Sequence, residues 1–206
     1  MTTKRSFSLL ALAAFLTLPA VAAPAYRRAP QVSPALNRFS VPTPQASLRV
    51  SARPRVVLQT TKGPITLELY KQSAPLQVRS FVYLAKRGFY NGTKFHRYAD
   101  LTGGGGFIIQ GGDPSTKVPA LSGFAGQGGP GYETPLEISN LKHDKFTIAA
   151  ARTSDPNSAG SQFYICQAPV HFLDGQYTVF GRVVAGQRAA LALRAGDTIK
   201  SARVVK

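Results

Sequence analysis

Short segments in which polar and large apolar residues alternate recur from Arg55 to Val205, and stretches rich in glycine and proline separate them. Alternation with a period of two is typical of β-strands that have one face on a core. Only two segments, 74–88 and 185–194, are expected to be helical. Many short strands with two helices predict a mostly β fold, a closed antiparallel barrel whose ends are capped by the helices. The expected strands are 55–60, 65–70, 94–98, a segment starting at 107, 146–151, 162–167, 178–184 and 198–205.

The first 25 residues have the layout of a secretory signal peptide. Lys4 and Arg5 give a charged start, an apolar run from Phe7 to Leu18 follows, and small residues come next. Cleavage is expected between Ala22 and Ala25. The run is too short to favour a stable membrane span, although a retained anchor is the alternative. We therefore expect export to the periplasm, the cell envelope or the medium.

Residues 26–54 are rich in proline, alanine and arginine. Few large apolar side chains are available there to offset the entropy lost on ordering, so the segment is predicted to be a flexible, partly extended tether. Its arginines, without any acidic residue, suit loose contact with an anionic envelope, and a solubilising spacer is the alternative. Residues 55–206 then form the predicted globular domain.

The chain is basic, with 25 Lys and Arg against 9 Asp and Glu. The aromatic residues do not interleave with basic ones as single-strand platforms require, so no nucleic-acid partner is expected. The single cysteine, Cys166, excludes an internal disulfide and is expected to be a buried, inert thiol. His143 and His171 have no ligand spacing, so neither a metal nor another cofactor is expected. No apolar seam argues for a dimer, so we expect a monomer.

Three segments place unusual side chains on what would be one face of the sheet. They are Phe95–Arg97, Phe107–Asp113 and Gly160–Ile165, which together bring an arginine, two glutamines and several aromatics. Such a mixture is unusual in a core. It suits a pocket that holds an apolar group beside a polarisable amide.

These segments, with Leu173-Asp174-Gly175 and Val179-Phe180-Gly181, resemble the cyclophilin family of peptidyl-prolyl cis-trans isomerases. The resemblance runs from about Arg55 to Val205. It implies an eight-stranded barrel capped by two helices, with an active groove on the outer face and proline-containing polypeptides as substrates. By position it makes Arg97 the catalytic arginine, supported by Gln110 and Phe107. The implied substrate-binding residues are His96, Ile108, Ala151, Arg152, Gln162, Tyr164, Phe172, Leu173 and Tyr177.

These residue types suit rotation about a prolyl bond. Amide resonance gives that rotation a barrier of roughly 18–20 kcal/mol, and no covalent bond need form. In the twisted transition state the lone pair localises on nitrogen, so a guanidinium interacts with it more strongly than with the planar amide. The function predicted is an exported isomerase that assists protein folding. The alternative is a non-catalytic module, or chaperone, that binds proline-containing peptides in the same groove.

Several roles have simpler alternatives. His96 suits a structural or positioning role better than proton transfer. Gln162 could instead satisfy buried backbone groups, and Phe172 and Tyr177 could be ordinary packing at the rim. A hydrolase built on Ser161 is not expected, because this serine lacks the context of a nucleophile elbow.

Two departures from the family pattern bear on the site. The connection Tyr98–Gly106 is long and rich in glycine. If it shifts the register of the flanking strands, Arg97 and Phe107 no longer face one slot. Phe172 stands where many eukaryotic members have tryptophan, and Tyr177 where they have histidine. Loss of the indole N–H donor predicts weak binding of cyclosporin.

Overall fold

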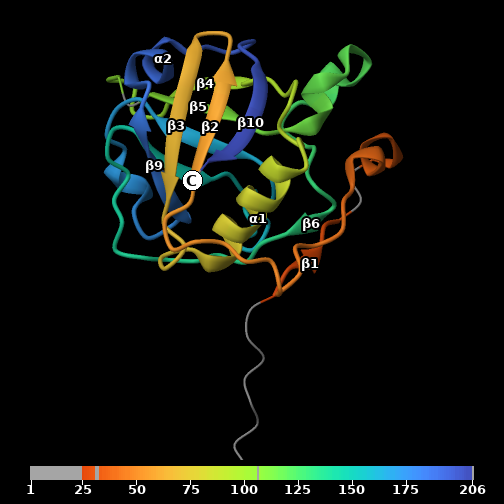
Figure 1. Cartoon of the computed structure of the whole chain (residues 1–206). Coiled ribbons are helices and arrows are strands. Elements are labelled where there is room, and N and C mark those ends of the chain that lie inside the picture. Colours follow the sequence, from red (N-terminus) through yellow and green to blue (C-terminus); the bar gives the residue numbers. More distant parts are fainter. Residues whose placement is uncertain (1–24, 31–32, 106, 206) are drawn as a thin grey trace, which may run out of the picture.

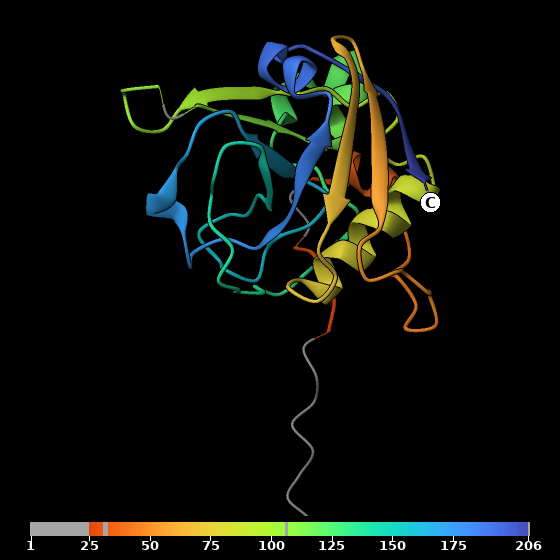
Figure 2. The ribbon, with the colours of Figure 1, turned by 60° about the vertical axis from the view of Figure 1, so that its left-hand side comes forward.

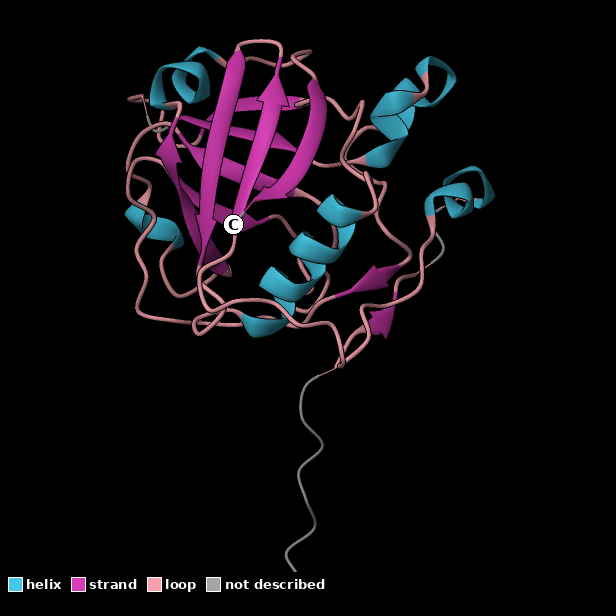
Figure 3. Cartoon of the chain, viewed as in Figure 1, coloured by secondary structure: helices cyan, strands magenta, loops and turns pink. Residues whose placement is uncertain are grey.

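The structure, a computed structural model, describes residues 25–30, 33–105 and 107–205. Its main element is one antiparallel sheet of eight strands in the order β10-β2-β3-β9-β7-β8-β5-β4 (Figures 1 and 3). The strands are β2 (Arg55–Thr60), β3 (Gly63–Leu69), β4 (Arg97–Asp100), β5 (Phe107–Gly111), β7 (Thr147–Ala150), β8 (Phe163–Cys166), β9 (Val179–Ala185) and β10 (Ile199–Val205). The prediction of a mostly β fold is confirmed. The predicted signal peptide lies, apart from its last residue, outside the described residues.

The sheet is curled but open, so the prediction of a closed barrel is wrong. Within the described residues, the edge strands β10 and β4 form no ladder with each other. The segment ahead of β4 meets the start of β10, through an isolated bridge between Lys94 and Thr198 and 2.8 Å bonds from the Phe95 N–H to the Asp197 carbonyl and from the Ile199 N–H to the Thr93 carbonyl. Beyond this contact β4 leaves the body with β5 as a projecting hairpin, on the left of Figure 2. The two edges therefore diverge, and the sheet forms a half-barrel.

The helices are shorter than the sequence pattern predicts. They are α1 (Pro75–Lys86), α2 (Gln187–Ala192) and four 3-10 turns, η1 (Pro34–Phe39), η2 (Pro114–Lys117), η3 (Pro119–Phe124) and η4 (His171–Leu173). The Glu137 carboxylate accepts bonds of 2.9 Å from the N–H groups of Leu76 and Gln77, which a helix start otherwise leaves unpaired. In the described ranges, no helix has the length and apolar character needed to cross a membrane.

The main core fills the curl of the sheet under α1. Phe81 of α1 packs against Phe163 of β8 and Phe180 of β9, with ring centroids 5.4 Å apart in both pairs. Side chains alternate across each strand, so Ile109 of β5 enters this core while its neighbour Ile108 points to the other face. The outer face of β5, β7 and β8 is thereby left for a second apolar cluster.

The segment before the domain differs from the predicted flexible tether. Its strand β1 (Arg27–Arg28) pairs with β6 (Tyr132–Glu133), and the Val41 N–H donates to the Pro130 carbonyl at 2.9 Å. Leu36 is buried. Figure 1 shows the segment in red and orange, running beside β6 and then past α1 into β2. Backbone pairing with the domain offsets the entropy that its few large apolar side chains could not.

Candidate active site

A second apolar cluster covers the outer face of the half-barrel. Because alternate residues of β5, β7 and β8 point outward, this face collects side chains separate from the core. The cluster consists of buried Ile108, Ala149, Tyr164, Cys166, Val170 and Val179, with half-buried Ala151, Leu173 and Tyr177 against them. Five of the predicted substrate-binding residues are thus brought together. Burial raises the pKa of the Cys166 thiol to about 11, which fits the predicted inert role.

Arg97 stands in one row with two other predicted site residues. It pairs in register with Gln110 of β5, which in turn pairs with Tyr164 of β8. Residues opposite one another on adjacent strands share a face, so all three side chains belong to the outer face. The Arg97 side chain is exposed, and its Nη1 donates to Oε1 of Gln110 at 3.3 Å. The guanidinium is therefore accessible to a ligand and directed by a partner.

The hydrogen-bond chain from Arg97 continues inward through amides. Nε2 of Gln110 donates to Oε1 of Gln162 at 3.0 Å, and Nε2 of Gln162 donates to the carbonyls of Gly126 and Gly128, both at 2.9 Å. Buried Asp113 fixes that loop, since its Oδ2 accepts the Gly128 N–H at 3.1 Å. The chain thus anchors the arginine to a rigid loop through two glutamine side chains.

A second polar network lies beneath the apolar cluster. Fully buried His143 places Nε2 2.9 Å from the Tyr164 hydroxyl and Nδ1 2.9 Å from Oδ1 of Asp174. Burial lowers the pKa of His143, against the effect of Asp174. Although burial opposes it, hydrogen bonds from His143 and Lys142 lower the pKa of Asp174 to about 2. The network therefore holds the Tyr164 ring in one position.

The rim of the site comes from two loops. The Arg152 guanidinium lies 4.3 Å from the centre of the Tyr177 ring and donates to the Gln176 carbonyl through Nε and Nη2. The Ala151 N–H donates to the Gln162 carbonyl at 3.0 Å. Phe172, in η4, is 52 % exposed. The predicted rim residues thus surround the cluster, with Phe172 the most open to solvent.

Two predicted residues take no part in the hydrogen-bond chain or the apolar cluster. Phe107 sits one residue from Ile108, hence on the opposite face of β5, where its ring stacks on Tyr98 with centroids 4.9 Å apart. The structure does not bring it together with Arg97 and Tyr164. His96 is half-buried beside Gln162, and neither ring nitrogen makes a hydrogen bond of good geometry among the described residues. Burial lowers its pKa, against the effects of Asp113, Lys94 and Gln162. Such a side chain fits packing better than proton transfer.

The model of the family described as cyclophilin type peptidyl-prolyl cis-trans isomerase matches residues 55–206. The chain belongs to the cyclophilin family. Its activity is that of a peptidyl-prolyl cis-trans isomerase. This cyclophilin is 38 % identical to a peptidyl-prolyl cis-trans isomerase of Synechococcus elongatus, over 73 % of this chain and 96 % of the relative. It is 40 % identical to the isomerase cypE of Dictyostelium discoideum, over 73 % of this chain and 94 % of the relative.

Solved structures show the same fold. A cyclophilin type isomerase from Cryptosporidium parvum superposes with a TM-score of 0.64 at 27 % identity, covering 75 % of this chain and 98 % of the other. The same protein, solved in the presence of the dipeptide Ala-Pro, gives a TM-score of 0.62 at 28 % identity, with coverages of 74 % and 99 %. The half-barrel with its outer groove is therefore the cyclophilin fold.

Sequence reasoning missed the polar groups that support the groove. Asp113 is the last residue of the motif segment Phe107–Asp113, and Asp174 lies within Leu173-Asp174-Gly175. The sequence therefore contained both residues in recognised motifs, but it did not reveal their hydrogen-bond partners. His143 gave no signal, because a lone histidine has no local pattern that predicts contact with Tyr164 of this cyclophilin, 21 residues later. Only the topology of the sheet places these groups together.

Proposed function

We propose that this cyclophilin twists prolyl amides by holding the Arg97 guanidinium beside a slot formed by Ile108, Tyr164 and Leu173. The observation that supports it most is the row of Arg97, Gln110 and Tyr164 in register across three strands. It sets a positioned cation next to an apolar surface. The Ala-Pro dipeptide present with the Cryptosporidium relative supports prolyl peptides as the ligands of this slot.

Catalysis follows from differential binding of the twisted amide. The apolar slot takes the proline ring, and the guanidinium donates to the nitrogen as its lone pair localises, or stabilises the adjacent carbonyl. Gln110 keeps the donor in place, so little reorganisation is needed when the bond turns. Phe107 has no part in the slot in this proposal, because it stacks on Tyr98 instead.

Removal of the arginine tests the mechanism. Arg97→Ala is expected to lower kcat/KM on an Ala-Pro peptide by about 10²–10³-fold, or about 2.7–4 kcal/mol, as for loss of one positioned donor. The measurement is exchange by NMR or a protease-coupled assay. Arg203→Ala removes an exposed arginine from β10, at the other edge of the sheet, and is the matched control. Near-normal turnover in Arg97→Ala rejects the role, and peptide binding without acceleration in the unaltered chain indicates a binding module.

We further propose that the enzyme acts on exported polypeptides. The signal-like composition of residues 1–25 supports this. Tyr26, which follows the expected cleavage region, donates its hydroxyl to the Leu76 carbonyl at 2.9 Å, so a chain cleaved there keeps this contact with the domain. Expression of the full chain in a bacterial host tests it by fractionation and N-terminal sequencing. A mature chain outside the inner membrane that starts between residues 23 and 26 is expected, and an intact chain in the cytoplasm contradicts export.

A further inference from the structure

The segment ahead of the family domain lies directly against one end of the groove. We call residues 25–30 and 33–41 the arm. The Ala29 N–H donates to the Gly131 carbonyl at 3.1 Å, and the Val41 N–H donates to the Pro130 carbonyl at 2.9 Å. Residues 130–133 continue the glycine loop whose carbonyls hold Gln162. The arm is therefore attached to the same loop that fixes the catalytic hydrogen-bond chain.

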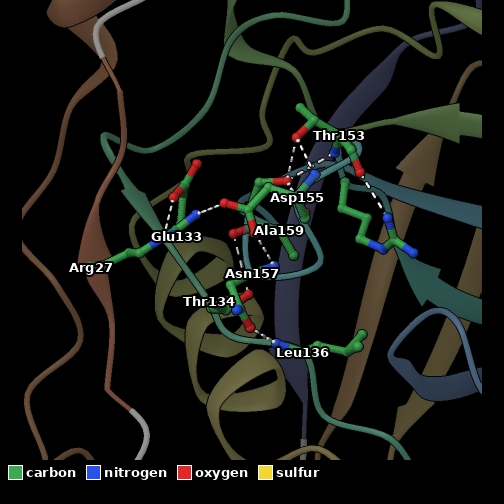
Figure 4. Close-up of polar contacts among 10 residues, drawn as sticks. Arg27, Glu133, Thr134, Leu136, Thr153, Asp155, Asn157 and Ala159 are labelled. Atoms are coloured by element: carbon green, nitrogen blue, oxygen red, sulfur yellow. Dashed lines mark hydrogen bonds and ion pairs between the residues drawn. The ribbon is translucent and has the colours of Figure 1, made fainter.

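Arg27 is the main side-chain anchor of the arm. Its Nε lies 2.6 Å from Oε2 of Glu133, and its Nη2 forms an ion pair with Asp155 (Figure 4). Glu133 is buried, and the hydrogen bond from Arg27 is the main cause of a lowered pKa for Asp155. One guanidinium thus ties together the arm, β6 and the loop that follows Arg152. Arg28, next along the same strand, is exposed and makes no such contact with any residue that the structure describes.

A cavity of about 450 Å³ lies between the arm and the groove. Pockets for organic ligands in proteins are commonly about 300–1,000 Å³. On the arm side it is lined by Ala29, Pro30, Ser33, Leu36, Asn37 and Ser40. On the domain side it is lined by groove residues, Gln110, Ala151, Arg152 and Gln162 among them. The cavity is thus continuous with the proposed active site, and the arm makes its outer wall.

We infer that the arm is part of the substrate site and forms a subsite for a bulky, uncharged side chain of the polypeptide near its proline. The inference rests on the proposed function. The lining is aliphatic at Leu36 and Pro30 and otherwise mostly hydroxyl, amide and glycine backbone. The lining carboxylates of Glu133 and Asp155 are already paired with Arg27, and the Arg152 guanidinium is turned to the Tyr177 ring and the Gln176 carbonyl. No unpaired charge on these acids is left to attract a charged side chain.

The spacing fixes which substrate residue reaches the cavity. The slot at Ile108 and the cavity at Gln110 are two residues apart on β5, and Tyr164 of β8 and Gln162, just before β8, repeat this spacing. Two residues of strand span roughly 7 Å. An extended substrate with its proline in the slot therefore brings a side chain two or three residues away to the arm.

A peptide panel on the full chain tests the subsite. The panel keeps Ala-Pro constant and places Ala or Phe two or three residues from proline, on either side. The readout is the ratio of kcat/KM for the Phe and Ala peptides. Asn37→Trp, an exposed position on the cavity wall, is expected to lower this ratio roughly tenfold at one peptide position, the usual scale for a hydrophobic pocket contact. Ala35→Trp, in the same turn but outside the cavity, is the matched control and should leave the ratio unchanged.

A second pair of variants tests the anchor. Arg27→Ala is expected to lower the same ratio, because the wall loses its ion pairs, whereas Arg28→Ala should not. Equal ratios in the unaltered chain, Asn37→Trp and Arg27→Ala overturn the inference. If the unaltered chain accelerates no peptide, the proposed function fails instead. Calorimetric titration with the Phe peptide then still decides the subsite, since weaker binding by Asn37→Trp than by Ala35→Trp supports it and equal binding overturns it.

Discussion

The slot of this cyclophilin has a polar floor in which each group is paired. The ring of Tyr164 forms part of the apolar surface, and its hydroxyl is hydrogen-bonded to His143. The other ring nitrogen of His143 is hydrogen-bonded to Asp174. A buried polar group that loses its partner costs more than the bond itself contributes, because it is already desolvated. The position of the ring is therefore tied to the stability of the domain.

Removal of the hydroxyl from Tyr164 should be costly for this reason. Tyr164→Phe leaves Nε2 of His143 unpaired and is expected to lower the free energy of unfolding by about 1–3 kcal/mol. Urea denaturation measures it. Tyr177→Phe is the control, since among the described residues its hydroxyl makes no hydrogen bond, and its ring stays against Tyr164. Equal stability of the two variants contradicts the pairing.

The same floor predicts how stability depends on pH. Burial lowers the pKa of His143 and of His96 below 6.5, so the unfolded chain binds protons first as the pH falls. The free energy of unfolding should therefore fall as the pH drops below about 6.5. The pKa of Asp174 is lowered from 3.8 to about 2, so the free energy of unfolding should fall further as the pH drops through that range. Denaturation curves at a series of pH values check this, and a flat profile from pH 7.5 to 5.5 contradicts the histidine part.

At the level of elements, the junction after β5 positions most of the site. Gly112 has φ +90°, and a Cβ there would lie 2.5 Å from the Ser161 carbonyl oxygen. This close approach brings Gln162, the residue before β8, alongside the end of β5, which carries Gln110. The two glutamines of the hydrogen-bond chain therefore depend on a residue without a side chain between them.

Gly112→Ala is expected to destabilise the domain by more than about 2 kcal/mol, because a steric overlap adds to the positive φ. Gly103→Ala separates the two effects. Gly103 also has a positive φ, +68°, but nothing lies within 4 Å of the added carbon. Gly103→Ala should therefore lower the free energy of unfolding by at most about 1–2 kcal/mol. Thermal unfolding and kcat/KM on an Ala-Pro peptide are measured for both variants. If Gly112→Ala and Gly103→Ala lose the same stability, the close contact with the Ser161 carbonyl does not contribute to the effect.

The motifs of the sequence predicted the elements that carry Arg97, Gln110, Gln162 and Tyr164, because alternation within a strand already assigns a face. Phe107 shows the limit of this reasoning. The family resemblance placed it in one slot with Ile108, but adjacent residues of a strand point apart, and the pairing of Asp100 with Phe107 extends the ladder to it. The closed barrel was also expected, and no local pattern reveals that β4 and β5 leave the body as a hairpin.

Taken as a whole, the molecule is larger than its family domain. The match begins at residue 55, whereas within the described residues Tyr26 already contacts the Leu76 carbonyl and the edge of the Tyr132 ring. The composition of residues 26–54 predicted a flexible tether because composition reports only how few large apolar side chains the segment has. It does not count the backbone bonds and ion pairs that the domain offers to a polar segment.

The arm should be held less firmly than the domain. Its anchors are a few backbone bonds and an ion-paired arginine that is 47 % exposed, so local opening should occur without global unfolding. Arg27→Ala is expected to speed hydrogen exchange at the amides of Ala29 and Val41 while leaving β7 and β8 unchanged. Exchange followed by NMR measures it, with Arg28→Ala as the control. If Arg27→Ala also speeds hydrogen exchange at the amides of β8, the arm and the domain instead open as one unit.

One wall of the cavity comes from residues that the family alignment does not include. Two cyclophilins with identical half-barrels but different arms could thus prefer different polypeptides, and comparison of their catalytic domains alone would not reveal it. Transplanting residues 26–54 onto a relative would then be a way to transfer a preference without altering any catalytic residue.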